Sequence, residues 1–152
     1  ENVASRFRTI LNDDDSIKHF FRVCADGPLI NLSGMEKSLK IIKNNDFVTS
    51  IPNKGFPMGA NIELFKKHTF LNHYDFFYKK SHFEHVTRYF YEKIESFNHL
   101  FISTNNFSFN YNETKFSVDV KEDLGKMRKI FKNYPKINLL SVEEQIKIYN
   151  SP

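Results

Sequence analysis

The alternation of helix-like and strand-like segments at the start of the chain constrains its fold most. Apolar residues at helical spacing predict a helix over Asn2–Leu11, and a short continuous apolar run predicts a buried strand over Phe20–Cys24. A second amphipathic helix is expected over Met35–Lys43, followed by a strand over Asp46–Ser50. Strands that alternate with helices usually pair in parallel through crossover connections. The order therefore predicts a three-layer α/β fold with a mostly parallel sheet and flanking helices.

The rest of the chain continues in the same style, and its length of 152 residues is enough for one domain with a core. We therefore expect a single α/β domain over residues 1–152. A long loop rich in Pro and Gly spans Ile51–Gly59 and has the composition of a binding loop. The further strands are expected at 60–65, 100–104, 107–111 and 116–119, and the further helices at 67–78, 83–94, 121–133 and 142–149.

Composition disfavours several classes of protein, and a nucleic-acid-binding module ranks last among the possible functions. The formal net charge is +4 and the basic residues are scattered, which does not favour a nucleic-acid surface. No apolar run approaches membrane-spanning length, so no membrane partner is expected. The single Cys24 cannot form an intramolecular disulfide and fits a reducing compartment, which predicts a cytoplasmic protein.

Asp26 stands where the first predicted strand ends. Gly27 and Pro28 follow it and mark a turn, because Pro28 has no N–H with which to continue a strand ladder. Ligands of open α/β sheets bind at the carboxyl ends of strands, where a carboxylate can hold a hard cation. Asp also begins ordinary turns, by accepting a hydrogen bond from the backbone two residues on. Both interpretations of Asp26 remain open on this segment alone.

Asp119 occupies the same kind of position. It ends the predicted strand Phe116–Asp119, just before the helix that begins at Lys121. If the two strands are neighbours, Asp26 and Asp119 face one crevice. Two hard oxygen ligands are what Mg²⁺ needs when substrate phosphates complete its coordination. The alternative is a helix cap with carboxylates favoured by the helix dipole, which accounts well for Glu122 and Asp123.

Four segments resemble motifs of the cytidylyltransferase family in their order and approximate spacing. This family includes the spore-coat polysaccharide biosynthesis proteins and the acylneuraminate and 3-deoxy-manno-octulosonate cytidylyltransferases. Arg22–Asn31 resembles the family segment Arg-Val-Thr-Gly-Asp-x-Pro-Leu-Ile-Asp, and Phe56–Glu63 resembles Pro-x-Gly-Leu-Asp-x-Glu. Glu84–Thr87 matches Glu-His-Val-Thr, and Phe116–Leu124 is similar to Val-Asp-Thr-Pro-Glu-Asp-Leu. The combination is more specific than any one of these segments.

The resemblance implies a Rossmann-like fold of the nucleotide-diphospho-sugar-transferase type. It also implies an activity: a hydroxyl of a sugar or sugar acid attacks the α-phosphate of CTP, and pyrophosphate leaves, with Mg²⁺ as cofactor. The product would serve surface polysaccharide biosynthesis. The residues that match the family motifs would be Asp26 and Asp119 for the metal and, for the substrates, Arg22, Pro57, Gly59, Asn61, Glu63, Glu84 and His85.

Two of these residues have alternative roles. His85 would hydrogen-bond a sugar-acid carboxylate or pack among aromatic residues of its helix. Glu63 is expected on the strand face opposite Ile62 and Leu64, because successive side chains alternate along a strand. There it would orient the sugar or a partner residue, or simply lie on a solvated face.

The sequence also departs from the family pattern. The family loop Arg-x-x-Ser-x-Arg-Leu-Pro-Gly-Lys, which cradles the triphosphate, would precede Glu1 and is not in the sequence. Ala25 replaces a Gly, and Asn61 replaces an Asp, which removes a charge from the expected sugar site. We therefore expect either the carboxyl-terminal portion of a cytidylyltransferase-like domain, incomplete at its N-terminus, or a degenerate relative. The degenerate relative would bind sugar without catalysis or form a homodimer through the aromatic-rich segment Phe70–Tyr91.

Overall fold

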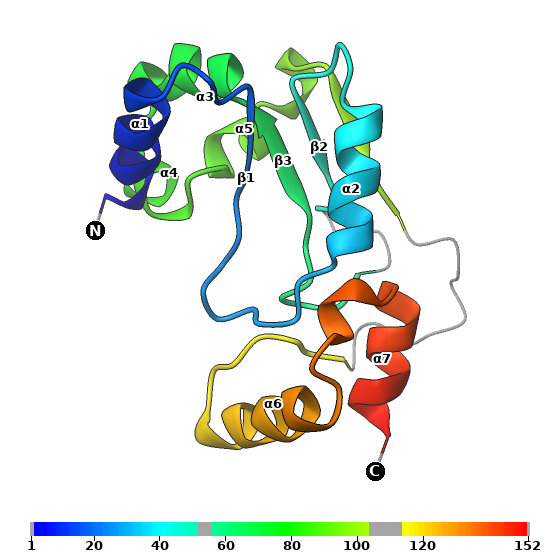
Figure 1. Ribbon diagram of the computed structural model, residues 1–152. Helices are drawn as coiled ribbons and strands as arrows, with labels where there is room; N and C mark the ends of the chain where they lie inside the picture. The colour runs from blue at the N-terminus through cyan, green and yellow to red at the C-terminus, as the bar shows by residue number, and fades with distance from the viewer. Residues whose placement is uncertain (1, 52–55, 104–113, 152) are drawn as a thin grey trace.

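The computed structural model describes residues 2–51, 56–103 and 114–151 (Figure 1). The strands are β1 (His19–Phe21), β2 (Phe47–Thr49), β3 (Glu63–Lys66) and β4 (His99–Phe101). The α-helices are α1 (Val3–Asp13), α2 (Leu32–Ile41), α3 (Lys67–His73), α4 (Lys80–His85), α5 (Arg88–Glu92), α6 (Lys121–Asn133) and α7 (Val142–Asn150). Short 3-10 turns lie at Tyr74–Phe76, Ile94–Ser96 and Ile137–Leu139.

The four strands form one mixed sheet in the order β1-β3-β2-β4. β3 pairs antiparallel with both β1 and β2, whereas β2 pairs in parallel with β4. The prediction of a mostly parallel sheet is therefore wrong. β1 and β2 do run in the same direction on either side of α2, as the helix-strand alternation indicates. However, β3 inserts between them in the opposite direction, which makes two of the three pairings antiparallel.

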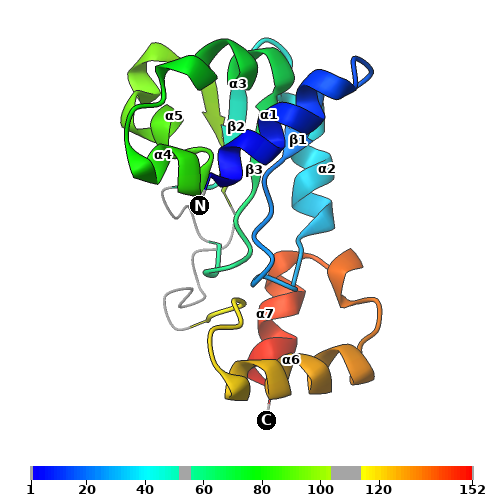
Figure 2. The same cartoon turned by 90° about the vertical axis from the view of Figure 1, so that its left-hand side faces the viewer.

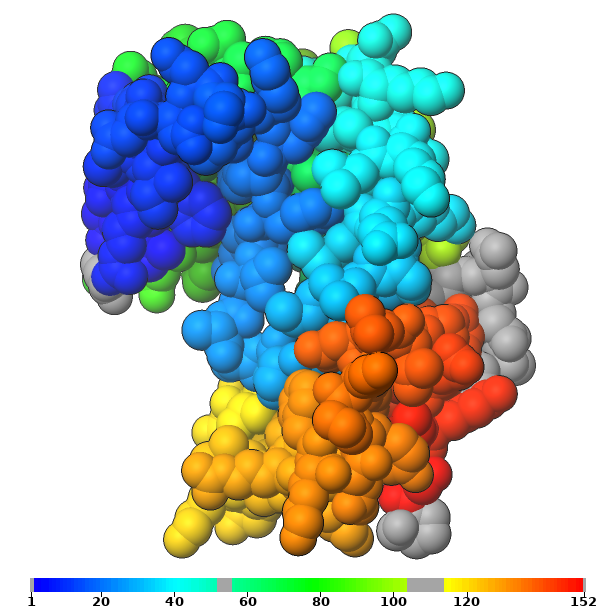
Figure 3. All heavy atoms as spheres, in the orientation of Figure 1, coloured from blue at the N-terminus to red at the C-terminus, as the bar shows by residue number. Residues whose placement is uncertain are grey.

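Helices flank both faces of the sheet (Figures 1 and 2). Because side chains alternate along each strand, Val48 and Leu64 belong to one apolar cluster, and Phe47 and Phe65 belong to another. The first cluster includes Ile41 and Ile42 at the end of α2 and extends to α6 and α7. The second is built from the aromatic rings of α1, α3, α4 and α5. Figure 3 shows α6 and α7, in orange and red, at the end of the molecule below α2.

The positions predicted for α1, α6 and α7 are confirmed. Three predicted elements between α1 and α6 need correction. The helix expected over residues 83–94 is broken at Val86, which adopts a positive φ of 55° and separates α4 from α5. The helix expected over 67–78 ends as α3 and a 3-10 turn. Phe116–Asp119 is no regular strand; Lys115 next to it makes an isolated parallel bridge to Met58. The strand expected at 107–111 lies outside the described residues.

The aromatic segment Phe70–Tyr91 mostly serves the core. Phe70, Phe77 and Phe90 are buried, whereas Phe76 and Tyr78 are exposed. A homodimer through this segment stays a prediction. Within the parts of the chain that the structure describes, no helix is both long and apolar enough to cross a membrane.

Candidate functional site

Three segments that are distant in the sequence are joined by backbone contacts beyond the end of β1. The Val118 N–H donates to the carbonyl oxygen of Asp26 over 2.7 Å, and the Phe116 N–H donates to the carbonyl oxygen of Met58 over 2.7 Å. The loop after β1, the loop before β3 and the segment before α6 therefore meet at one edge of the sheet. This is the edge at which the parallel strands β1, β2 and β4 end, where open α/β sheets bind ligands.

Two glycines allow this close approach. A Cβ atom at Gly27 would lie 2.6 Å from the carbonyl oxygen of Gly59. A Cβ atom at Gly59 would lie 2.6 Å from the backbone nitrogen of Ser117, and Gly59 has a φ of +92°, which L side chains rarely adopt. The family-like segments that contain these glycines thus require glycine for backbone packing. The role of Gly59 in substrate binding stays a prediction.

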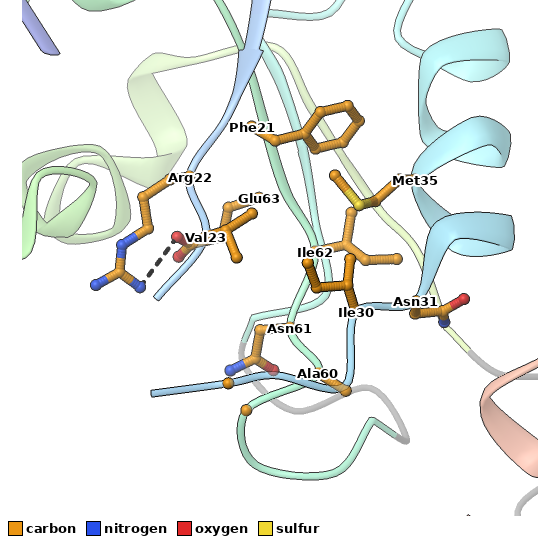
Figure 4. A pocket seen from close by; sticks show the side chains of 12 residues that line it. Phe21, Arg22, Val23, Ile30, Asn31, Met35, Ala60, Asn61, Ile62 and Glu63 are labelled. Carbon is orange, nitrogen blue, oxygen red and sulfur yellow. Dashed lines mark hydrogen bonds and ion pairs between the residues drawn. The ribbon is translucent and has the colours of Figure 1, made fainter. Parts of the chain in front are cut away.

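A cavity of about 210 Å³ opens where the three segments meet. It holds six of the predicted site residues, including Asp26 and Asp119, which come from segments far apart in the sequence. The full lining is Arg22, Val23, Cys24, Asp26, Met58, Gly59, Asn61, Glu63, Ser117 and Asp119. A smaller cavity adjoins it and shares Arg22, Val23, Gly59, Asn61 and Glu63 (Figure 4).

The two aspartates present carboxylate oxygens with few partners. The Asp26 carboxylate accepts no hydrogen bond from any described residue, so the side chain does not cap its own turn. Asp119 uses its Oδ2 atom, which lies 2.7 Å from Lys115 Nζ and 3.4 Å from Ser117 Oγ. Its Oδ1 atom has no hydrogen-bond donor among the described residues. Both residues are exposed to solvent.

Asp123, rather than Asp119, supplies the helix cap at the start of α6. Its Oδ2 atom accepts the N–H groups of Asp119 (3.0 Å) and Val120 (3.2 Å), as well as Lys115 Nζ (2.9 Å). The hydrogen bond from Lys115, followed by the backbone hydrogen bond from Asp119, lowers the pKa of Asp123 to about 2. The same ion pairs, with Asp119 first, raise the pKa of Lys115. Lys115 therefore stays charged and holds Asp119 beside the start of α6.

Glu63 lies at the centre of a buried polar network. It is 2% exposed, because α5 covers the sheet face to which it points. Its Oε1 atom accepts the hydroxyls of Tyr91 (2.8 Å) and Thr87 (3.2 Å), and its Oε2 atom lies 3.4 Å from Arg22 Nη1. Figure 4 shows Arg22 and Glu63 together, on the opposite side of the strands from Phe21. The alternation predicted the face correctly, but a solvated face for Glu63 is wrong.

Burial governs the ionisation of this network. Desolvation raises the pKa of Glu63, although Arg22 and the hydroxyls of Tyr91 and Thr87 oppose the shift. Desolvation, followed by the Glu63 charge, raises the pKa of Tyr91, which therefore keeps its proton for the hydrogen bond to Glu63. Burial also raises the pKa of the Cys24 thiol, which makes a thiolate nucleophile there unfavourable.

Three predicted substrate-binding residues do not line the cavity. Glu84 and His85 are exposed at the end of α4. Pro57 is buried next to the lining residue Met58, and its carbonyl oxygen accepts the Ala60 N–H. Within the Glu84–Thr87 segment, Thr87 contacts the site, because its hydroxyl donates a hydrogen bond to the lining residue Glu63.

Sequence reasoning missed three polar residues of the site. Thr87 and Tyr91 are four residues apart, at the spacing of one helix face, which is the signal that would have grouped them. Lys115 forms an ion pair with Asp119, four residues later. Both residues precede α6, so helical spacing could not have indicated this pair. Among the described residues, no cluster of three or more His, Cys, Asp or Glu side chains has metal-binding geometry.

The comparisons with known proteins bear on the fold. No family model and no curated protein matches the sequence. Among solved structures, a cytidylyltransferase from Leptospira borgpetersenii serovar Hardjo-bovis (strain JB197) matches with a TM-score of 0.79 and 19% sequence identity. The match covers 99% of this chain and 66% of that chain, so the present sequence spans slightly less than two thirds of the longer one. At this identity the similarity establishes the fold: the chain has the α/β fold of a cytidylyltransferase, with a mixed four-stranded sheet and flanking helices.

Proposed function

We propose that this chain belongs to a nucleotidyltransferase that activates a sugar or sugar acid with CTP and releases pyrophosphate. One observation carries the proposal: Asp26 and Asp119 line one cavity at the strand-end edge of a cytidylyltransferase-like fold. In such a reaction a sugar hydroxyl attacks the α-phosphate of CTP. The protein contributes mainly by positioning the two substrates and stabilising charge.

The donor set at this edge fits Mg²⁺. Asp26 and Asp119 offer hard carboxylate oxygens. Both oxygens of Asp26, and Oδ1 of Asp119, accept no hydrogen bond from a described residue. Mg²⁺ in nucleotide sites is commonly held by one or two carboxylates, with substrate phosphates and water in the remaining positions. These two residues would hold the ion. When bound, the ion supplies positive charge that neutralises the phosphates.

Other residues in and next to the cavity have positioning roles in this proposal. Lys115 fixes the Asp119 carboxylate through its 2.7 Å ion pair and is itself anchored on Asp123 at 2.9 Å. Asn61, beside Glu63 on the cavity wall, presents an amide that can donate to and accept from sugar hydroxyls. The interlocked backbones of Gly27 and Gly59 keep these groups at fixed separations.

The direct test is pyrophosphate release from CTP by the complete protein. We would assay it with Mg²⁺ and, as acceptors, N-acetylneuraminate and 3-deoxy-manno-octulosonate. Asp119→Asn should lower the rate on the order of 100-fold, because a ligand of the charge-stabilising ion loses its charge. Asp13→Asn, at the exposed end of α1, is the matched control and should keep the wild-type rate.

Two results would contradict the proposal. Undiminished turnover by Asp119→Asn would reject the metal-binding role of this carboxylate. A complete protein that binds a sugar acid but releases no pyrophosphate would favour the alternative, a non-catalytic sugar-binding relative.

A further inference from the structure

We propose that Tyr91 is a positioning residue of the same site: through the buried Glu63 carboxylate it holds the Arg22 guanidinium at the cavity, where Arg22 receives an anionic oxygen group of the substrate. This inference rests on the proposed function. It adds the chemistry of one recognition contact and the residues that hold it in place.

Two hydroxyl groups of the network, those of Tyr91 and Thr87, donate to Glu63, and the Thr87 hydroxyl also lies 3.3 Å from the carbonyl oxygen of His85. Because the single Tyr91 hydroxyl proton is donated to Glu63 Oε1, the contact of 2.9 Å between Tyr91 and Thr49 must be donated by the Thr49 hydroxyl. The Ile51 N–H in turn donates to Thr49 Oγ1 over 3.0 Å. The row of donors begins at the Ile51 N–H, passes through Thr49, which is fully buried in β2, and ends at the carboxylate. Such a row fixes the carboxylate in one orientation.

The two carboxylate oxygens of Glu63 have different hydrogen-bond partners. Oε1 receives the hydroxyls of Tyr91 and Thr87, so only Oε2 remains for Arg22. The backbones of Arg22 and Glu63 are also joined, because the Arg22 N–H donates to the Glu63 carbonyl oxygen over 3.0 Å. The guanidinium is therefore held by its backbone and by one Nη1 contact of 3.4 Å. The remaining N–H donors of Arg22 stay available to a ligand, since the described residues provide no other acceptor for them.

The negative charges around the cavity favour a cationic side chain at the position of Arg22. Three carboxylates line it, those of Asp26, Glu63 and Asp119, and Arg22 is the one cationic side chain among its described lining residues. The Arg22 side chain is 23% exposed, so a ligand can reach it. A planar guanidinium with free N–H groups matches the geometry of a carboxylate or phosphate. Without a bound metal ion, an anionic substrate group would be repelled by the three carboxylates, and Arg22 gives it an attractive contact from the protein itself.

The anionic group has two candidate sources with the same chemistry. One is a phosphate oxygen of the nucleotide, and the other is the carboxylate of a sugar acid. Both offer two oxygens to the guanidinium, so the experiment has one arm for each source and one for inorganic phosphate.

The test follows the Arg22 Nε–H signal by NMR in the complete protein. The signal is assigned by its loss in Arg22→Gln. CTP, N-acetylneuraminate and inorganic phosphate are then titrated separately. We expect the signal to shift with at least one of them: a response to CTP and phosphate identifies a nucleotide phosphate, and a response to N-acetylneuraminate identifies a sugar-acid carboxylate.

The positioning role is tested with two variants of one helix. Tyr91→Phe should raise the Kd of the responding ligand about tenfold, the loss expected for one hydrogen bond to a charged group. Tyr89→Phe, also on α5, is the matched control, because its hydroxyl makes no hydrogen bond with the described residues. If Tyr91→Phe does not fold, Thr87→Val removes the other donor to the same oxygen and should also weaken binding.

The outcomes separate this inference from the proposed function. The proposed role of Arg22 is overturned if none of the three ligands shifts the wild-type Arg22 Nε–H signal. The positioning role is overturned if folded Tyr91→Phe, or folded Thr87→Val where Tyr91→Phe does not fold, binds the responding ligand with wild-type affinity. The nucleotidyltransferase proposal fails on a different result, the absence of pyrophosphate release, whatever Arg22 does.

Discussion

The backbone nitrogen of Val118 lies 2.7 Å from the carbonyl oxygen of Asp26. This hydrogen bond places Asp119, the next residue, beside the loop that carries Asp26. The neighbouring segments are fixed in the same way, because Phe116 donates to Met58 and Gly59 packs against Ser117. The two exposed carboxylates thus line one cavity because main-chain hydrogen bonds hold their segments together.

Gly59 is the residue at which this arrangement is most sensitive to substitution. Gly59→Ala should lower the free energy of unfolding by about 1–3 kcal/mol, because Ala disfavours a φ of +92° and its Cβ atom would approach Ser117. Gly125→Ala is the opposite case. A Cβ atom there meets nothing within 4 Å, and helix α6 should gain about 0.5–1 kcal/mol. Urea unfolding of both variants checks the pair. Equal stability of Gly59→Ala and wild type would show that the interlocked backbone is not required.

Glu63 should make the stability of the protein depend on pH. Burial raises its pKa in the folded state above the ordinary value of 4.5. The folded protein therefore binds this proton more tightly than the unfolded chain does. The resulting stabilisation is fully present below pH 4.5 and is lost as the pH rises through the folded-state pKa.

Glu63→Gln removes this titration and isolates its effect. The free energy of unfolding of the wild type, relative to Glu63→Gln, should fall as the pH rises from about 4 to about 8. Urea unfolding of both proteins across this range measures the difference. A difference that stays constant, or that grows in favour of the wild type, would show that burial does not control the ionisation of Glu63.

Asp123 should show the opposite dependence. Its pKa falls from the ordinary 3.8 to about 2, mainly through Lys115, so its stabilisation is present above pH 3.8 and is lost as the pH falls to about 2. Asp123→Asn should lower the urea midpoint at neutral pH and have little effect near pH 2. Glu122→Gln, in the same turn of α6 and exposed, should change the midpoint less. An equal loss for Asp123→Asn at both pH values would rule out this ionisation as the cause.

Local patterns predicted the helices at both ends of the chain well. Asn31 caps α2 by accepting the Gly34 N–H, and Ser141 and Glu144 form the capping box of α7, as their spacing indicates. The break between α4 and α5 could not be predicted in this way. It depends on a positive φ at Val86, a residue type that avoids this conformation, so surrounding packing imposes the turn.

Long-range contacts explain the other differences. The insertion of β3 between β1 and β2 is a choice of strand neighbours, which the helix-strand alternation does not encode. For Glu63, alternation along the strand gave the correct face, but the burial of that face depends on where α5 packs. The Tyr91 hydroxyl was missed for a related reason, because its role depends on a long-range contact with Glu63 that no local pattern encodes.

The central claim is that Asp26 and Asp119 hold one divalent cation together. Binding of Mn²⁺, which takes oxygen ligands as Mg²⁺ does, tests it most directly by electron paramagnetic resonance of the complete protein with CTP. We predict that Asp26→Asn and Asp119→Asn each weaken Mn²⁺ binding about tenfold or more, and that Asp13→Asn leaves it unchanged. Wild-type Mn²⁺ affinity in both Asp26→Asn and Asp119→Asn would contradict the claim.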